Sequence, residues 1–215
     1  MQADLLKLPD TLDGLADDEL LSLPATWEEY LDVLETAPYT IQFLDSEIIM
    51  SQATADHETI IIRLGALFLN YFDELIVDYR VLSSNVKIVV PNQAGDLNAD
   101  LSVVKEPVEY GATPGGKVST VRITNPVIVV EVLSKSTRNF DQGEKLAAYK
   151  LIPSLQHILF VAQTQAYASV YSRTGVPDEW LNHDYRTLEA GVKLGDLALP
   201  MADIYRKTTF GVLPS

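Results

Sequence analysis

The chain has 215 residues, enough for one well-buried domain with little left over for a second. Its 47% apolar and 21% charged residues are typical of an ordinary soluble globular protein, and the lack of cysteine excludes disulfides, thiolate zinc sites and cysteine nucleophiles. The net charge of −14 argues against a nucleic-acid partner, because phosphate binding relies on Lys and Arg. The distribution of charge weakens this objection: residues 1–50 carry 12 acids and one base, whereas residues 51–215 carry 18 acids and 15 bases.

The N-terminal part of the sequence predicts an extension that precedes the folded domain. Residues 1–25 are acidic, and we expect them to form a loosely attached extension with a short helix near residues 16–22. The domain itself is expected over residues 26–205, and a C-terminal tail over residues 206–215.

The domain begins with a helix and a hairpin. Thr26 can cap a helix over residues 27–34, because a threonine hydroxyl accepts a hydrogen bond from the backbone amides of the first turn. Residues 39–50 then alternate like a hairpin that turns at residues 45–46.

A second helix and a series of strands follow. Thr54 or Asp56 is expected to cap this helix, whose apolar residues recur at helical spacing. They are Ile60, Ile61, Leu64, Leu67, Phe68 and Tyr71. Strands are predicted at residues 79–82, 86–90, 99–104 and 127–133, with a flexible loop over residues 111–119.

The last part of the chain predicts one more helix and further strands. Asp141, with Glu144 three residues later, indicates a helix start similar to a capping box, and the helix must end before Pro153. Strands are expected at residues 157–162 and 168–172, and an apolar segment over residues 191–205 is expected to close one edge. The order of elements predicts a single α/β domain with a mixed β-sheet flanked by helices.

Glu131 is the most informative residue, because it is an isolated acid inside the apolar, β-branched run of residues 126–133. A lone carboxylate in a buried strand is costly unless it is paired, hydrogen-bonded or bound to a metal. Asp100, in another strand-like stretch, is the obvious partner, since two acids on neighbouring strands can hold a hard divalent cation. The alternative is a structural ion pair between Glu131 and either Arg138 or Lys145. Strand alternation puts Glu131 on one face with Val127, Val129 and Leu133.

An ordered set of segments resembles a known family. The segments are residues 55–58, 98–104, 125–134, 136–138, 141–149 and 152–156. Together they resemble the Uma-two family of putative restriction endonucleases, a branch of the PD-(D/E)XK nuclease superfamily, over roughly residues 26–205. The resemblance implies a restriction-endonuclease-like core.

The resemblance also implies a metal-dependent phosphodiesterase site. Asp100 and Glu131 would hold Mg²⁺ (or Mn²⁺), and a nearby lysine would orient or deprotonate the attacking water and stabilise negative charge. The superfamily places that lysine two residues after the second acid, where this chain has Leu133. The family pattern suggests Lys145 as the substitute. Lys135 is the nearer alternative, but it lies in a loop with no fixed direction, so Lys145 is favoured.

Four further residues are auxiliary candidates. His57 and Glu58 are interpreted mainly as helix-start residues that satisfy backbone amides, although His57 lies on the core face of its helix and can border the site. Arg138 can contact phosphate or pair with a carboxylate. Tyr149, four residues after Lys145, is interpreted as a packing residue with its hydroxyl near the site.

The sequence leaves two functions open. The first is a metal-dependent endonuclease that hydrolyses DNA phosphodiester bonds, working as a homodimer. The alternative is a catalytically inactive nuclease fold that binds nucleic acid or protein. No stretch approaches the roughly 18 apolar residues of a membrane span, and the first residues lack the features of a signal peptide, so we expect a cytoplasmic protein with no membrane partner.

Overall fold

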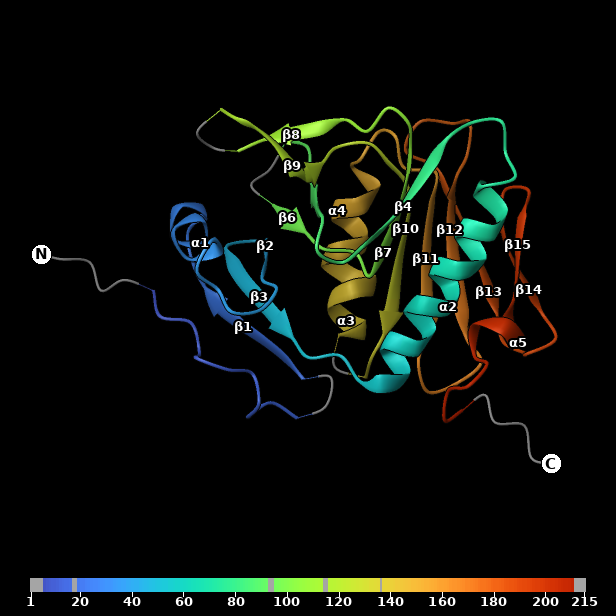
Figure 1. Cartoon of the computed structure of the whole chain (residues 1–215), viewed down its shortest axis with the longest axis horizontal. Helices are drawn as coiled ribbons and strands as arrows, with labels where there is room; N and C mark the ends of the chain where they lie inside the picture. Colours follow the sequence, from blue (N-terminus) through green and yellow to red (C-terminus); the bar gives the residue numbers. More distant parts are fainter. Residues whose placement is uncertain (1–5, 17–18, 93–94, 114–115, 136, 211–215) are drawn as a thin grey trace, which may run out of the picture.

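The computed structural model describes residues 6–16, 19–92, 95–113, 116–135 and 137–210 (Figure 1). Its first half contains β1 (Leu20–Pro24), α1 (Trp27–Leu34), β2 (Gln42–Leu44), β3 (Glu47–Ser51), α2 (Ala55–Phe72), β4 (Tyr79–Ser83), β5 (Lys87–Val89), β6 (Asp96–Leu97), β7 (Leu101–Lys105), β8 (Tyr110–Ala112) and β9 (Val118–Ile123). Its second half contains β10 (Pro126–Leu133), α3 (Arg138–Phe140), the π-helical turn η1 (Asp141–Lys145), α4 (Leu146–Lys150), β11 (His157–Ala162), β12 (Ala168–Arg173), β13 (Trp180–Tyr185), β14 (Gly191–Leu194), β15 (Leu197–Pro200) and α5 (Met201–Ile204). None of the helices described is long and apolar enough to cross a bilayer.

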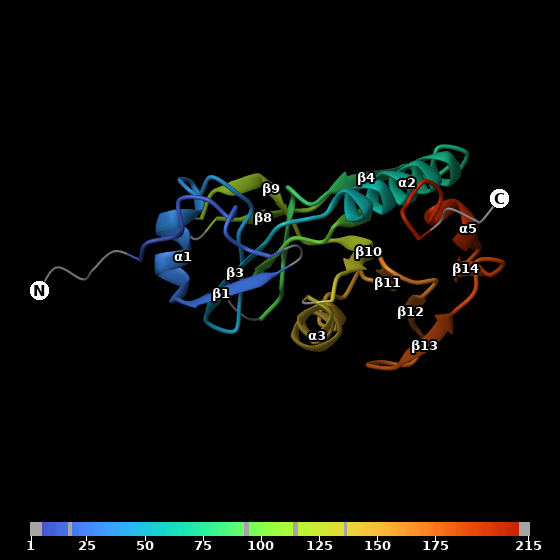
Figure 2. The ribbon, with the colours of Figure 1, turned by 90° about the horizontal axis from the view of Figure 1, so that it is seen from below.

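The centre of the fold is a six-stranded mixed sheet in the order β13-β12-β11-β10-β7-β4. Strands β10 and β11 are parallel, and the other neighbours are antiparallel. Helix α2 lies on one side of β10 and the α3–α4 helix on the other (Figure 2). This arrangement confirms the predicted α/β class with a mixed sheet flanked by helices.

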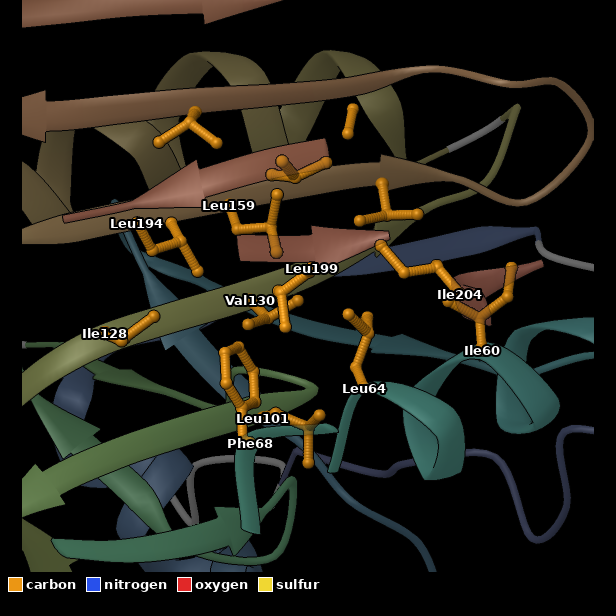
Figure 3. Close-up of a cluster of buried hydrophobic side chains, with 14 of the residues drawn as sticks. Ile60, Leu64, Phe68, Leu101, Ile128, Val130, Leu159, Leu194, Leu199 and Ile204 are labelled. Carbon is orange, nitrogen blue, oxygen red and sulfur yellow. The ribbon is translucent and has the colours of Figure 1, made fainter. Parts of the chain in front are cut away.

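Side-chain alternation along β10 divides the core between the two faces of this sheet. Ile128 and Val130 pack toward α2, where Leu64 and Phe68 are fully buried (Figure 3). Burial of such large apolar side chains contributes about 1.5–3 kcal/mol each. Leu133 packs in the cluster on the opposite face, with residues of α4 and β11. That opposite face is the one that also carries Glu131.

One residue of β10 does not follow the predicted alternation. Val127 packs against the cluster of the α2 face, although the sequence pattern placed it with Glu131. The pairing register between β10 and β7 shifts between Pro126 and Ile128. Such an irregularity redirects the side chain at that point, so the strict period of two begins only after it.

A second sheet, in the order β1-β3-β2-β6-β5-β9-β8, is formed mainly by the N-terminal half of the chain. Its hairpin β2–β3 confirms the predicted turn, since Asp45 and Ser46 both have positive φ angles of 50° and 66°, as a tight hairpin turn requires. Helix α1 confirms the predicted cap, because the Thr26 hydroxyl accepts from the Glu29 amide and the Glu29 carboxylate accepts from the Thr26 amide.

The second sheet also corrects two predictions. Where a short helix was expected near residues 16–22, Leu20–Pro24 forms β1, which pairs with β3, and residues 17–18 lie outside the described part. Leu12 is buried against the same sheet, so this part of the extension is packed rather than loose. The expected loop over residues 111–119 instead belongs to the hairpin β8–β9, with residues 114–115 outside the described part.

The helix after β10 begins earlier than predicted. It starts at Arg138, and Asp141 is therefore an internal residue and not its cap. The helix passes through η1 and ends at Lys150, before Pro153 as expected. The C-terminal segment forms the hairpin β14–β15 and α5, which pack on the α2-side core instead of closing a sheet edge. In both ribbon views, the α3–α4 helix lies between the two sheets (Figures 1 and 2).

Candidate active site

The two predicted acids lie opposite each other at the edge between β7 and β10. Val130 pairs with Leu101, so continuing the antiparallel register places Glu131 across from Asp100, the residue just before β7. Glu131 is 2% exposed. The Oδ2 atom of Asp100 accepts a hydrogen bond of 2.7 Å from the amide of Val132. The sheet therefore brings both carboxylates to one place on the α4 face.

Lys145 extends from η1 into the same place. Its Nζ lies 2.9 Å from Glu131 Oε1 and donates a 2.9 Å hydrogen bond to the carbonyl oxygen of Asn98. The Oδ1 atom of Asp141 lies 3.8 Å from the same Nζ. A π-helical turn changes which side chains share a helix face, and here Asp141 and Lys145 are both buried. Lys145 is thus no surface lysine, since its side chain is 3% exposed.

Two further side chains hold the acids in position. The Tyr149 hydroxyl donates to Glu131 Oε1 at 2.5 Å, so it lies beside one of the two predicted acids. On the opposite side, His57 Nε2 lies 3.2 Å from Asp100 Oδ2. The interpretation of His57 as a residue that satisfies backbone amides is wrong, because Thr54 caps α2 and its hydroxyl accepts from the His57 amide.

Burial and neighbouring charges shift the pKa values of this cluster in different directions. Burial, aided by the negative charges of Asp100 and Asp141, raises the pKa of Glu131 to about 8, although Lys145 opposes this. Burial alone would raise the pKa of Asp100, but the His57 hydrogen bond, the Lys145 charge and the Val132 amide lower it below its usual value.

The pKa of Lys145 is raised. Burial disfavours its ammonium form, but the surrounding carboxylates of Glu131, Asp141 and Asp100 outweigh that effect. The pKa of the Tyr149 hydroxyl also lies well above its usual value because of burial and the adjacent Glu131, so the hydroxyl keeps its proton and remains a hydrogen-bond donor. At neutral pH the site therefore holds a firmly protonated lysine beside acids of unequal strength.

His57, both predicted acids, Asp141 and Lys145 line a pocket of about 230 Å³. The chemically reactive side of the pocket consists of His57, Glu58, Asp100, Glu131, Asp141 and Lys145. The facing side comes from the N-terminal sheet and the chain next to it, with Leu20, Thr40, Gln42, Met50, Ser51 and Gln52. The lining contains four acidic side chains, one lysine and one histidine, and this excess of acidic groups suits the binding of a cation.

The donor set fits a hard divalent cation that keeps part of its water shell. Within the described ranges, no group of three or more His, Asp or Glu side chains is arranged as a metal site of its own. Mg²⁺ commonly uses one or two carboxylates together with waters and substrate phosphate oxygens, which matches the pair Asp100 and Glu131. Among the described residues no hydrogen bond engages Asp100 Oδ1 or Glu131 Oε2, so each carboxylate offers one oxygen.

Of the other predicted candidates, Glu58 lines the pocket, whereas Lys135 and Arg138 do not. Glu58 lines it, but its side chain is 58% exposed, and its carboxylate lies 3.6 Å from His57 Nδ1. Lys135 is exposed and does not line the pocket. The Arg138 guanidinium lies 5.9 Å from the Tyr167 ring centroid, and within the described part of the chain it forms no ion pair with a carboxylate.

Sequence reasoning missed two residues of the site. Asp141, interpreted as a helix cap, is the third acid of the cluster and is buried, and its spacing of four from Lys145 was the available signal. Asn98 supplies the carbonyl that holds Lys145, and its own amide group donates to the Ser84 carbonyl and accepts from Lys87. No local pattern indicates such a carbonyl, because the contact joins residues that are far apart in the sequence.

Comparisons with known proteins show what the chain is similar to. A family model described as "Uma2: Putative restriction endonuclease" matches residues 27–202. The chain is 32% identical over 186 residues to the uncharacterized protein slr1290 of Synechocystis sp. strain PCC 6803, which covers 85% of this chain and 92% of that protein. It is 28% identical over 158 residues to the uncharacterized protein sll1609 of the same organism, covering 73% and 84%.

A solved structure shares the fold. A putative nuclease belonging to DUF820 from Anabaena variabilis is similar to this chain with a TM-score of 0.65 and 15% identity, covering 85% of this chain and 98% of the other.

Proposed function

The chain belongs to the Uma2 family of putative restriction endonucleases, and from this premise we propose that it is a metal-dependent endonuclease that hydrolyses DNA phosphodiester bonds. The single observation that carries the proposal is the position of Lys145, whose Nζ lies 2.9 Å from Glu131 Oε1. The superfamily position for the lysine is Leu133 in this chain, and Leu133 is buried in the apolar cluster. Lys145 supplies from the helix the ammonium that the strand lacks.

Each residue of the cluster then has a distinct role. Asp100 and Glu131 would hold Mg²⁺ or Mn²⁺, which, when bound, polarises the phosphate and lowers the pKa of the attacking water. Lys145 donates hydrogen bonds toward the phosphate and stabilises the charge that develops there. Its raised pKa favours this role over proton abstraction, since a general base must be able to lose its proton near the working pH.

The residues around the acids keep them oriented. His57 holds Oδ2 of Asp100, and the Val132 amide donates to the same oxygen, so the carboxylate cannot rotate freely. Tyr149 does the same for Oε1 of Glu131. Ligands oriented by a second layer of hydrogen bonds bind a metal more tightly and in a more defined geometry.

Nicking of a supercoiled plasmid tests the proposal directly. We expect Mg²⁺- or Mn²⁺-dependent nicking that EDTA abolishes, and a loss of at least about a hundredfold in Glu131→Gln and Lys145→Met. Matched controls are the exposed residues Glu144→Gln and Lys135→Ala, which should retain activity. Circular dichroism shows whether each variant is folded.

Two outcomes would reject the proposal. Equal nicking by all the variants would indicate a contaminant or a different site. DNA binding without any metal-dependent cleavage would favour the inactive nuclease fold instead. The homodimer and the cytoplasmic location stay predictions, and light scattering after size-exclusion chromatography checks the first.

A further inference from the structure

The pocket wall that faces the acids carries no charged side chain and is mostly polar, with Leu20 and Met50 as its apolar members. The residues of the N-terminal sheet region that line it include Thr40, Gln42, Ser51 and Gln52. Lys145 is the one lysine or arginine in the pocket lining that the structure describes. Surfaces that bind the backbone of duplex DNA rely on several Lys and Arg side chains that neutralise successive phosphates. This wall has the chemistry to bind something other than a row of phosphates.

Amide and hydroxyl side chains are among those that read base edges and contact sugars. Within the described residues, no hydrogen bond engages the side chains of Thr40, Ser51 or Gln52, so their donors and acceptors can serve a ligand. The side chain of Gln42 is already engaged, because its Oε1 accepts a hydrogen bond of 2.9 Å from the backbone amide of Asn98.

The depth of the pocket restricts what can reach the acids. The side chains of Glu131 and Lys145 are each 3% exposed, and Asp141 is 7% exposed. The pocket volume of about 230 Å³ is below the roughly 300–1,000 Å³ of a drug-sized ligand site, so only part of one nucleotide fits inside it, and the rest lies against its open side, where Thr40 and Ser51 are exposed. A phosphodiester of an intact duplex lies on the outside of a stiff, stacked helix that cannot enter a pocket of this size, whereas an unpaired nucleotide can be turned out of the stack and inserted alone.

We infer that the pocket accepts a single unpaired nucleotide of a nucleic-acid strand, with its phosphodiester at Asp100 and Glu131 and its base or sugar against the wall of Thr40, Ser51 and Gln52. The position of the phosphodiester rests on the proposed function, and the inference adds the substrate class: single-stranded or locally unpaired nucleic acid. The duplex around such a nucleotide has to open before the strand is cut.

Fluorescence anisotropy of a labelled DNA oligonucleotide, as a single strand and as its full duplex, tests this inference on the whole protein. The buffer contains Ca²⁺, which takes the same oxygen ligands as Mg²⁺, and a gel confirms that the strand stays intact. We expect the single strand to bind at least about tenfold more tightly than the duplex, and Gln52→Ala to weaken single-strand binding by about fivefold. The control is Asn70→Ala on the exposed side of α2, which should bind like the unmodified protein.

The outcomes separate this inference from the proposed function. Duplex binding as tight as single-strand binding, or unchanged single-strand binding in Gln52→Ala, overturns the inference. If the expected preference is found but neither DNA is cut with Mg²⁺ or Mn²⁺, the pocket assignment is supported and the proposed hydrolysis is rejected.

Discussion

The replacement Lys145→Met tests the buried charge cluster most sharply. Methionine keeps much of the length of the side chain but removes the ammonium that lies 2.9 Å from Glu131 and 3.8 Å from Asp141. Removing one partner of a buried ion pair typically costs about 3–5 kcal/mol, because the remaining charge has no compensation. For a domain of this size each kcal/mol lowers the melting temperature by roughly 2–4 °C.

The cost should depend on pH, because Glu131 can take up a proton. Its pKa is already raised to about 8, and the loss of Lys145 raises it further. At low pH the variant buries a neutral carboxyl group, and the cost falls to the roughly 1–3 kcal/mol of lost hydrogen bonds. The cost rises as the pH exceeds 8, where Glu131 of the unmodified protein is ionised, and it reaches about 3–5 kcal/mol only above the higher pKa of Glu131 in the variant.

Urea unfolding in EDTA, followed by circular dichroism at low and high pH, measures this cost. The matched control is Lys135→Met at an exposed lysine, where we expect a change within about 0.5 kcal/mol. In Glu131→Gln/Lys145→Met the two changes should be non-additive by about 1–3 kcal/mol, because the residues touch. Equal costs for the two lysine variants, or a cost for Lys145→Met that does not vary with pH, would refute the reasoning.

Three further predictions concern the carboxyl group of Glu131, the buried Lys87 and the helix cap Thr26. First, the raised pKa of Glu131 stabilises the metal-free fold below the usual glutamate pKa, and this contribution is lost as the pH rises toward about 8. Thermal melts in EDTA should therefore show a melting temperature that falls over this pH range. In Glu131→Gln the melting temperature should depend less on pH. Calorimetry should also show Mg²⁺ binding more tightly with rising pH, with proton release. Second, Lys87→Met should destabilise the protein by about 2–4 kcal/mol in urea unfolding. Lys87 Nζ donates to the Ile41 carbonyl at 2.7 Å and to Asn98 Oδ1 at 3.1 Å, and both acceptors would be left buried without this donor. An unchanged unfolding midpoint would contradict this. Third, Thr26→Ala should cost about 1 kcal/mol by the same assay through loss of the capping box, and Thr26→Ser should restore most of it.

The elements that the sequence predicted well are those whose signals are local. Thr26 and Thr54 are caps with side chains able to bind the first amides, and both cap the helices that follow them. The apolar stripe of α2 and the run of β10 carry the periods of a helix and a buried strand. The strands that were missed are short or polar. An example is β13, whose residues 180–185 are mostly exposed and form a strand only because β12 offers an edge.

Two further errors concern the type and the start of an element. Leu20–Pro24 has residues compatible with a helix, and it is a strand because β3 pairs with it. Asp141 and Glu144 have the spacing of a helix start, but the preceding residues Arg138–Phe140 are already helical. In the first case a neighbour in space overrode the local preference, and in the second the helix begins three residues before the predicted cap.

The sequence by itself determined which residues could form the site. An acid in an apolar strand had to be compensated, which pointed to Glu131 and to Asp100 as its candidate partner, whereas Lys145 was suggested by the family resemblance. The tertiary structure decided how they meet: the register of β7 and β10 sets the acids opposite each other, and η1 turns Lys145 and Asp141 inward. It alone added the Asn98 carbonyl and the neutral wall of the N-terminal sheet, because contacts between distant segments depend on chain topology and leave no trace in local spacing.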